Sequence, residues 1–236
     1  MTTICISSNY IFLVHGDIKQ IRINDGQLIR SIDLLRSCPQ SVCVSPDEQF
    51  LYTAGSIYHF DDDDDDDNDI DRYRIEDGSH MTMYGCKGDC VCISPDGRFL
   101  FIFEDTTGEI QVVDVEDTTN VRTLYFDQLR LQPTNGNMCL SPDGNQIFVA
   151  AMNRICILHP NGEERILQIP FVTYCICVSM DGEFIFASDG SNKIKGNIGI
   201  SIPIPNISRN TIPNIVEIVI LDLFSCCIFN VYIYSL

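Results

Sequence analysis

Cysteine is the residue type most able to do chemistry in this chain of 236 residues, which contains twelve of them. Five stand two residues before a serine in a recurring phrase: Cys5, Cys43, Cys92, Cys139 and Cys177. Equivalent thiols of this kind are able to bind a metal or to undergo redox chemistry. We favour the simpler interpretation, in which cysteine is a small buried hydrophobe, because equivalent atoms of neighbouring repeats should lie too far apart for a disulfide. The remaining pairs, such as Cys90 with Cys92, lack the C-x-x-C spacing of a structural zinc site, so we predict no metal and no cofactor.

The four histidines do not indicate an active site. They recur at no shared position of the repeats described below: His15, His59, His80 and His159. Acid–base catalysis needs titratable groups that converge on one point. The sequence also contains no phosphate-binding glycine loop, nucleophile elbow or His-Glu metal motif. We therefore name no catalytic residue.

A dense run of aspartates is the second chemical feature. Like charges at this density repel one another and are too costly to bury, so we predict a disordered, solvent-exposed loop over residues 57–71. The run lacks the alternating pattern of a calcium-binding loop. It would instead attract another protein with a basic surface, and the candidate partner-binding residues are Asp61, Asp62, Asp63, Asp64, Asp65, Asp66, Asp67, Asp69 and Asp71.

The overall charge excludes some partners. The net charge is −18, and without those nine aspartates 24 acids remain against 15 bases, which leaves −9. Binding to nucleic acid or to an anionic membrane draws on lysine and arginine, so we expect neither partner. The N-terminus has no basic start and no small-residue cleavage signal, which predicts a cytoplasmic protein with reduced thiols.

These residues are positioned by an internal repeat. Four phrases are nearly alike, VCVSPDEQFLYTA, VCISPDGRFLFIF, MCLSPDGNQIFVA and ICVSMDGEFIFAS, and a shorter copy, ICISSNYIFLV, opens the chain. Their serines, at positions 7, 45, 94, 141 and 179, are spaced by 38, 49, 47 and 38 residues. In each phrase two alternating strands flank a turn, and in Ser94-Pro95-Asp96-Gly97 proline, aspartate and glycine have the preferred places. Each phrase therefore predicts a β-hairpin.

A second hairpin follows each phrase. Asp25-Gly26, Asp77-Gly78 and Asn161-Gly162 stand between further alternating strands, and such dipeptides are strong hairpin signals. Each repeat then contains four antiparallel strands in about 40 residues, the size of one propeller blade. We predict an all-β fold, a β-propeller of about five four-stranded blades that start near residues 3, 41, 90, 137 and 175, with the last blade incomplete or irregular.

The SPDG phrases, the Pro39–Ala54 stretch and the strand Ile110–Val115 resemble those of WD-repeat and YVTN-type propeller proteins. The chain has no tryptophan, so the Trp-Asp signature is absent and only Asp114 stands at a comparable place. The resemblance implies that the first strand of each blade lines a central channel. It also implies a non-catalytic scaffold that binds proteins, as most WD-repeat proteins do, or alternatively an enzyme like the lactonases that share the YVTN-type fold.

Two further expectations come from the repeat. The aromatic residues at one position of every second strand should pack between adjacent blades: Phe12, Tyr52, Phe101, Phe148 and Phe186. Glu48 replaces the turn glycine of the other copies and should therefore adopt a positive φ.

The repeats cover residues 1–195, and the composition changes in an isoleucine-rich segment over residues 196–236. Three interpretations stay open: strands that complete the last blade, a segment foreign to the propeller, and a membrane span over residues 218–236. Asp222 argues against the membrane span, since an aspartate near the bilayer centre costs about 2.5–3.5 kcal/mol.

Overall fold

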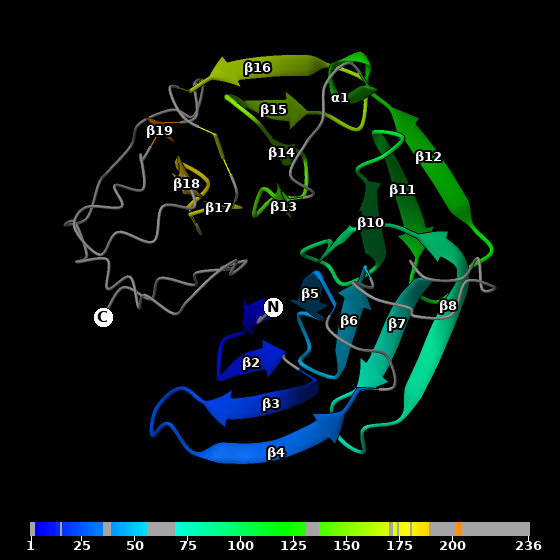
Figure 1. Cartoon of the computed structure of the whole chain (residues 1–236), viewed down its shortest axis with the longest axis vertical. Helices are drawn as coiled ribbons and strands as arrows, with labels where there is room; N and C mark the ends of the chain where they lie inside the picture. The colour runs from blue at the N-terminus through cyan, green and yellow to red at the C-terminus, as the bar shows by residue number, and fades with distance from the viewer. Residues whose placement is uncertain are drawn as a thin grey trace.

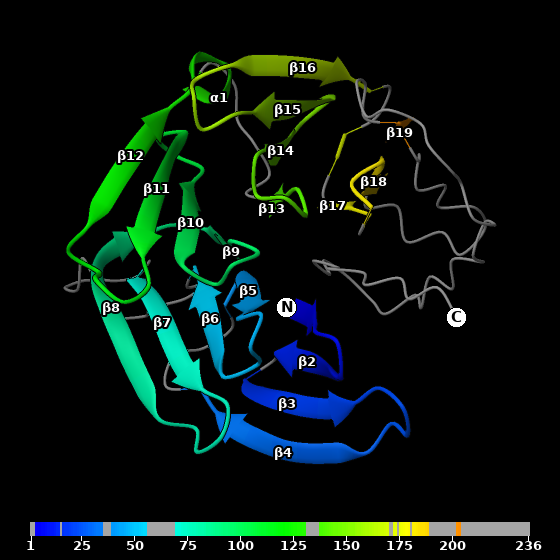
Figure 2. The same ribbon diagram turned by 180° about the vertical axis from the view of Figure 1, so that it is seen from behind.

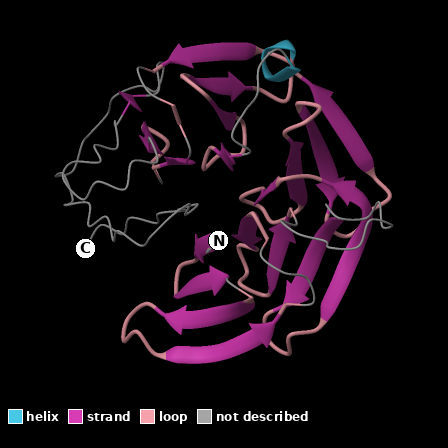
Figure 3. Cartoon of the chain, in the orientation of Figure 1, coloured by secondary structure: helices cyan, strands magenta, loops and turns pink. Residues whose placement is uncertain are grey.

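The computed structural model describes residues 3–14, 16–34, 39–55, 69–130, 137–169, 172–173, 175–179, 181–188 and 202–203. Secondary structure in these ranges is almost entirely β-strand, and the exception is the short helix α1 (Asp127–Arg130) (Figure 3). No helix in the described ranges is long and apolar enough to cross a membrane.

The strands form five antiparallel sheets that follow one another along the chain. The first contains β1 (Thr3–Ile6), β2 (Tyr10–Val14), β3 (Asp17–Arg22) and β4 (Leu28–Asp33). The second contains β5 (Ser41–Val44), β6 (Phe50–Ala54), β7 (Asp69–Arg74) and β8 (His80–Lys87). The third contains β9 (Cys90–Ile93), β10 (Phe99–Glu104), β11 (Glu109–Asp114) and β12 (Val121–Tyr125). The fourth contains β13 (Asn137–Leu140), β14 (Ile147–Ala151), β15 (Arg154–Leu158) and β16 (Glu164–Gln168). The fifth contains β17 (Cys175–Val178), β18 (Phe184–Ser188) and β19 (Ile202–Pro203).

Figure 1 shows these sheets arranged in chain order around a common centre, with the first strand of each sheet innermost and the last at the periphery. Neighbouring sheets contact one another through their first strands, β1 with β5, β5 with β9, β9 with β13 and β13 with β17. The view from behind shows the same order (Figure 2). The sheets are therefore the blades of a β-propeller, and the predicted fold class is confirmed. Within the described residues the fifth blade has three strands and is incomplete.

The Ser-Pro-Asp-Gly phrase forms the turn between the first two strands of a blade. In the third blade the Ser94 hydroxyl donates to Asp96 Oδ1 at 2.5 Å, and the Phe99 N–H donates to Ser94 Oγ at 2.9 Å. The Asp96 carboxylate also accepts the Arg98 N–H at 3.0 Å. The same bonds recur around the serines of the second, fourth and fifth blades. The turn is thus set by residues no more than five positions apart.

Glu48 has φ 58°, which confirms the predicted positive φ. Its side chain also has a role that the sequence did not reveal. The Asn9 N–H donates to Glu48 Oε1 at 3.2 Å, and Asn9 Nδ2 donates to Glu48 Oε2 at 3.2 Å. Glu48 therefore links the first-blade turn to the second-blade turn.

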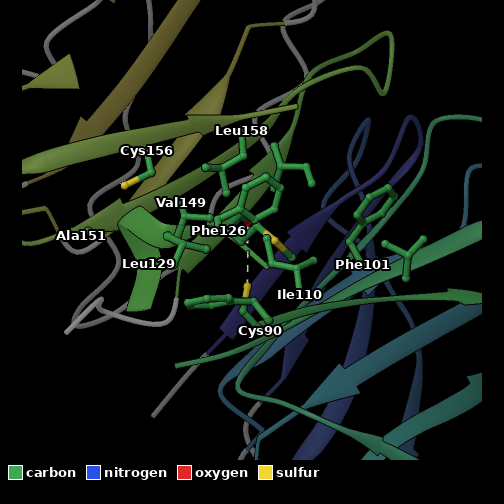
Figure 4. Packing of buried hydrophobic residues seen from close by; sticks show 13 residues of the cluster. Cys90, Phe101, Ile110, Phe126, Leu129, Val149, Ala151, Cys156 and Leu158 are labelled. Carbon is green, nitrogen blue, oxygen red and sulfur yellow. Dashed lines mark hydrogen bonds between the residues drawn. The ribbon is translucent and has the colours of Figure 1, made fainter. Parts of the chain in front are cut away.

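The predicted packing of aromatic residues between blades is confirmed for four of the five. None of these four is more than 6% exposed: Phe12, Tyr52, Phe101 and Phe148. Each belongs to a cluster that includes residues of the following blade, as Phe101 does with Leu158 of the fourth blade (Figure 4). Phe186, in the fifth blade, is only partly buried.

The opposite face of the first blade is more open than its counterparts. Ile11, Leu13 and Ile21 are partly buried, whereas Leu51 and Leu100, which correspond to Ile11, are fully buried. Figures 1 and 2 agree that the described strands of the first and fifth blades do not lie against each other. These two blades therefore end the described array.

Two predicted boundaries need comment. The predicted disordered loop over residues 57–71 extends too far, because β7 begins at Asp69 and pairs with β6 and β8. In the isoleucine-rich segment, β19 (Ile202–Pro203) pairs with β18. The remaining expectations for residues 196–236 lie outside the described residues.

Candidate functional site

The aspartate run emerges at one face of the propeller. In antiparallel blades the second strand ends where the third begins, and the fourth strand ends at the same face before the chain enters the next blade. The connection from β6 to β7 contains Asp61 to Asp67, so both of its ends lie at this face. We call it the acidic face. The aspartates from 61 to 67 themselves lie outside the described residues.

Three further acids reach the acidic face from the third blade and from the connection that precedes it. Asp89 lies between β8 and β9, Glu104 ends β10, and Asp105 follows β10. We call these three residues the acidic cluster. The Asp105 N–H donates to Asp89 Oδ2 at 2.8 Å, which holds the two segments together. Sequence analysis missed the cluster because Asp89 stands 15 residues before the adjacent pair Glu104 and Asp105.

The carboxylates of the acidic cluster lie close enough to influence one another. Burial raises the pKa of Asp89, and the carboxylates of Asp105 and Glu104 raise it further, against the opposing hydrogen bond from the Asp105 N–H. Two threonine hydroxyls donate to Glu104, Thr106 at 3.2 Å and Thr107 at 2.9 Å. These bonds stay within one turn, so they orient the carboxylate without neutralising its charge.

The structure corrects the prediction for Asp71. This residue is 3% exposed and therefore cannot dock a partner. The Thr82 hydroxyl donates to Asp71 Oδ1 at 2.8 Å, and His80 Nε2 lies 2.9 Å from the same oxygen. Those partners on β8 replace water, which allows the carboxylate to be buried. In the sequence, His80 and Thr82 stand two residues apart in the strand that pairs with the strand of Asp71. This spacing was a usable signal that Asp71 is hydrogen-bonded and not free to bind a partner. Asp69 begins β7, directly at the acidic face.

The described histidines do not come together. His80 lies in the second blade, where its ring is 4.9 Å from the Tyr73 ring. His159 lies in the fourth blade, with its Nε2 3.4 Å from Gln146 Nε2. Within the described ranges there is also no group of three or more histidine, cysteine, aspartate or glutamate residues that could hold a metal ion.

The recurring cysteines lie on the innermost strands. Cys5, Cys43, Cys139 and Cys177 are buried, as the buried-hydrophobe interpretation predicts, and Cys92 is partly exposed. Burial raises the pKa of Cys43 well above its usual range, and the nearby thiols of Cys5 and Cys90 raise it further.

Comparison with known proteins supports the fold and does not identify the function. No protein-family model matches the chain, and no curated protein matches it. In structure it is similar to hydrazine synthase of Kuenenia stuttgartiensis, with a TM-score of 0.59 and 16% sequence identity over 80% of this chain. The match spans 61% of the hydrazine synthase chain, less than two thirds of its length. In total 1235 solved chains match, and the likeness identifies the architecture and not an activity.

Proposed function

We propose that this β-propeller is a non-catalytic protein-interaction scaffold, related to WD-repeat or YVTN-type propellers, that binds a basic segment of a partner protein at its acidic face. The observation that carries the proposal is the location of the acidic cluster. Asp89 comes from one segment and the adjacent residues Glu104 and Asp105 from another, and all three lie at the face where the aspartate run emerges. Rigid blades hold these charges in place, which lowers the entropy lost on binding.

The charge arrangement favours a lysine- or arginine-rich partner. Acids gathered on one face attract cations and accelerate encounter with a basic surface. Asp89, Glu104 and Asp105 are partly exposed, so solvent ions reach these charges and the attraction should weaken as salt rises. Each exposed ion pair contributes about 0.2–1 kcal/mol, so three pairs at about 0.5 kcal/mol correspond to about a tenfold change in affinity.

The test uses a fluorescent lysine-rich peptide and its anisotropy on titration with the full chain. We expect the triple variant Asp89→Asn/Glu104→Gln/Asp105→Asn to bind about tenfold more weakly. Deletion of residues 61–67, which leaves β7 intact, should weaken binding further.

Glu163→Gln is the matched control. Glu163 is exposed in the turn between β15 and β16, which lies at the opposite face of the propeller. Unchanged affinity in both the triple variant and the deletion, or an equal loss in the control, would contradict docking at the acidic face.

A propeller enzyme is the alternative, and one observation favours it. Buried Asp71 is hydrogen-bonded to His80, and a carboxylate that orients an imidazole is the arrangement of a general base. However, the pair lies between the third and fourth strands of its blade, away from the innermost strands, so we rank the scaffold first. Lactone hydrolysis that is lost in His80→Gln would reverse this ranking.

A further inference from the structure

One side of the first blade presents a row of apolar side chains that crosses all four of its strands. Each member is the directly opposed partner of the next in the sheet register, and directly opposed residues lie on the same side of an antiparallel sheet. This side faces away from the second blade, because successive residues point to opposite sides and Phe12, the neighbour of Ile11, packs against the second blade. None of the four residues is fully buried, and Leu28 is 53% exposed. We call this set the apolar row: Ile6, Ile11, Ile21 and Leu28.

The corresponding side of the second and third blades is a packing surface. In the second blade, Leu51 and Tyr73 occupy the two central positions of the row and are buried against residues of the first blade. In the third blade, Leu100 and Val113 occupy these positions and are buried against residues of the second blade. The first blade has no blade before it in the described array, and the described strands of the fifth blade do not lie against it (Figures 1 and 2). The apolar row is therefore a packing surface that no described sheet covers.

Residues 204–236 have the composition of a segment that covers such a surface. Their only charged side chains are Arg209, Glu217 and Asp222, so their net charge is −1. Residues 215–223 and 227–236 are two runs rich in β-branched and aromatic residues, which favour β-strands. A strand of about nine residues extends over about 30 Å, whereas four paired strands span about 14 Å. Either run is therefore long enough to cross the apolar row.

The connection from the fifth blade is long enough to bring these runs to the first blade. The first and fifth blades are the two ends of the described array (Figure 1). Residues 204–214 connect β19 of the fifth blade to the first run, and an extended chain of about eleven residues reaches about 36 Å. Packed sheets lie about 10 Å apart, so this connection is able to pass more than one sheet.

Other occupants suit the apolar row less well. A second copy of the chain would bring another net charge of −18 against the first, which opposes association. The basic partner proposed above is attracted by carboxylates, and the apolar row contains none. A segment of the same chain is also present at an effective concentration in about the millimolar range, which a separate partner rarely matches.

We propose that residues 215–236 pack as β-strands on the apolar row and cover the open side of the first blade. The first blade is then packed on both sides, as the second and third blades are. The driving force is the removal of apolar side chains from water, which needs no charged contact. Completion of the fifth blade alone would leave the apolar row exposed, so the two placements of this segment predict different neighbours for Leu28.

The first experiment places a photo-cross-linker in the apolar row of the full chain. Leu28→p-benzoylphenylalanine changes an exposed residue of the outermost strand, so the blade should still fold. After irradiation, mass spectrometry of the monomer should identify a cross-link to residues 215–236. Val121→p-benzoylphenylalanine is the matched control, because Val121 is 41% exposed at the same register position of the third blade, where this side faces the second blade. No cross-link to residues 215–236, a cross-link to a second copy, or an equal yield in the control would overturn the proposal.

The second experiment measures hydrogen exchange of the full chain by mass spectrometry. Backbone amides of residues 215–236 should exchange at least tenfold more slowly than those of an unstructured chain. Ile21→Asp puts a charge in the apolar row and should remove this protection, whereas Ile166→Asp, at an exposed position of β16, should leave it unchanged. The amides of the third and fourth blades should keep their protection in both variants. Wild-type amides without protection in residues 215–236, or equal protection there in Ile21→Asp, would contradict packing on the first blade.

Discussion

Removal of one ring between two blades tests the packing that holds the propeller together. Phe148 is fully buried in the cluster between the fourth and fifth blades, together with Ile155, Ile176 and Ile185. Phe148→Ala removes the transfer free energy of the ring and leaves a cavity lined by these side chains. Such changes cost about 3–5 kcal/mol, a large part of the about 5–15 kcal/mol that stabilises a typical domain.

Phe186 offers the matched comparison within the same molecule. It occupies the corresponding position in the fifth blade but is only partly buried. Water is able to fill the space left by Phe186→Ala, so the cavity penalty largely disappears. The expected cost is then below the about 1.5–3 kcal/mol that full burial of one large apolar side chain contributes.

Urea denaturation followed by far-ultraviolet circular dichroism measures both changes. Phe148→Ala should lower the denaturation midpoint clearly more than Phe186→Ala, with similar dependence of the unfolding free energy on urea. Phe101→Ala should behave like Phe148→Ala, because Phe101 is 6% exposed. Equal shifts in Phe148→Ala and Phe186→Ala would refute the assignment of these rings to inter-blade packing.

Three further predictions concern the turns. Glu48→Gly relieves a positive φ that costs about 1–2 kcal/mol but loses the bonds to Asn9, so we expect a gain in unfolding free energy of less than about 1 kcal/mol. The gain should be larger in an Asn9→Ala background, and a decrease there would argue against strain at this turn. The hydrogen bond from the Ser94 hydroxyl lowers the pKa of Asp96 in the folded chain. The ionised carboxylate therefore stabilises the fold above the unfolded pKa of about 3.9, and this contribution is lost as pH falls through the lower folded pKa. Asp96→Asn should therefore make the denaturation midpoint less sensitive to pH below about 4, and an unchanged pH profile would contradict this assignment. Gly144→Ala should destabilise more than Gly26→Ala, because both glycines have positive φ but only at Gly144 would a Cβ lie 3.1 Å from the proline of the preceding turn. Equal thermal shifts for the two glycine variants would show that this contact between turns is unimportant.

Much of this fold was predictable because hydrogen bonds between residues close in the sequence form its turns. The Ser-Pro-Asp-Gly turn is held by bonds between Ser94, Asp96 and Phe99, all within five residues, so the phrase itself specifies the hairpin. The alternation of the flanking strands placed Phe101 and its counterparts at the blade interfaces. The positive φ of Glu48 followed from the glycines that replace it in the other copies.

The candidate sites depended on residues far apart in the chain. Asp71 and Asp89 are both aspartates of the second repeat, yet Asp71 is buried and Asp89 borders the acidic face. The difference arises because β8 offers His80 and Thr82 to Asp71, whereas Asp89 meets further carboxylates from the next blade.

The two cysteines of β9, Cys90 and Cys92, show the same limit. A repeat places Cys90 and Cys92 on one side of one strand, which the sequence alone determines by alternation. That their sulfurs share the carbonyl of Met138 was decided by the docking of two blades whose contacting residues lie 46 positions apart. Turn formation depends on neighbours in the chain, but the burial and ionisation of a side chain depend on which groups the fold brings next to it.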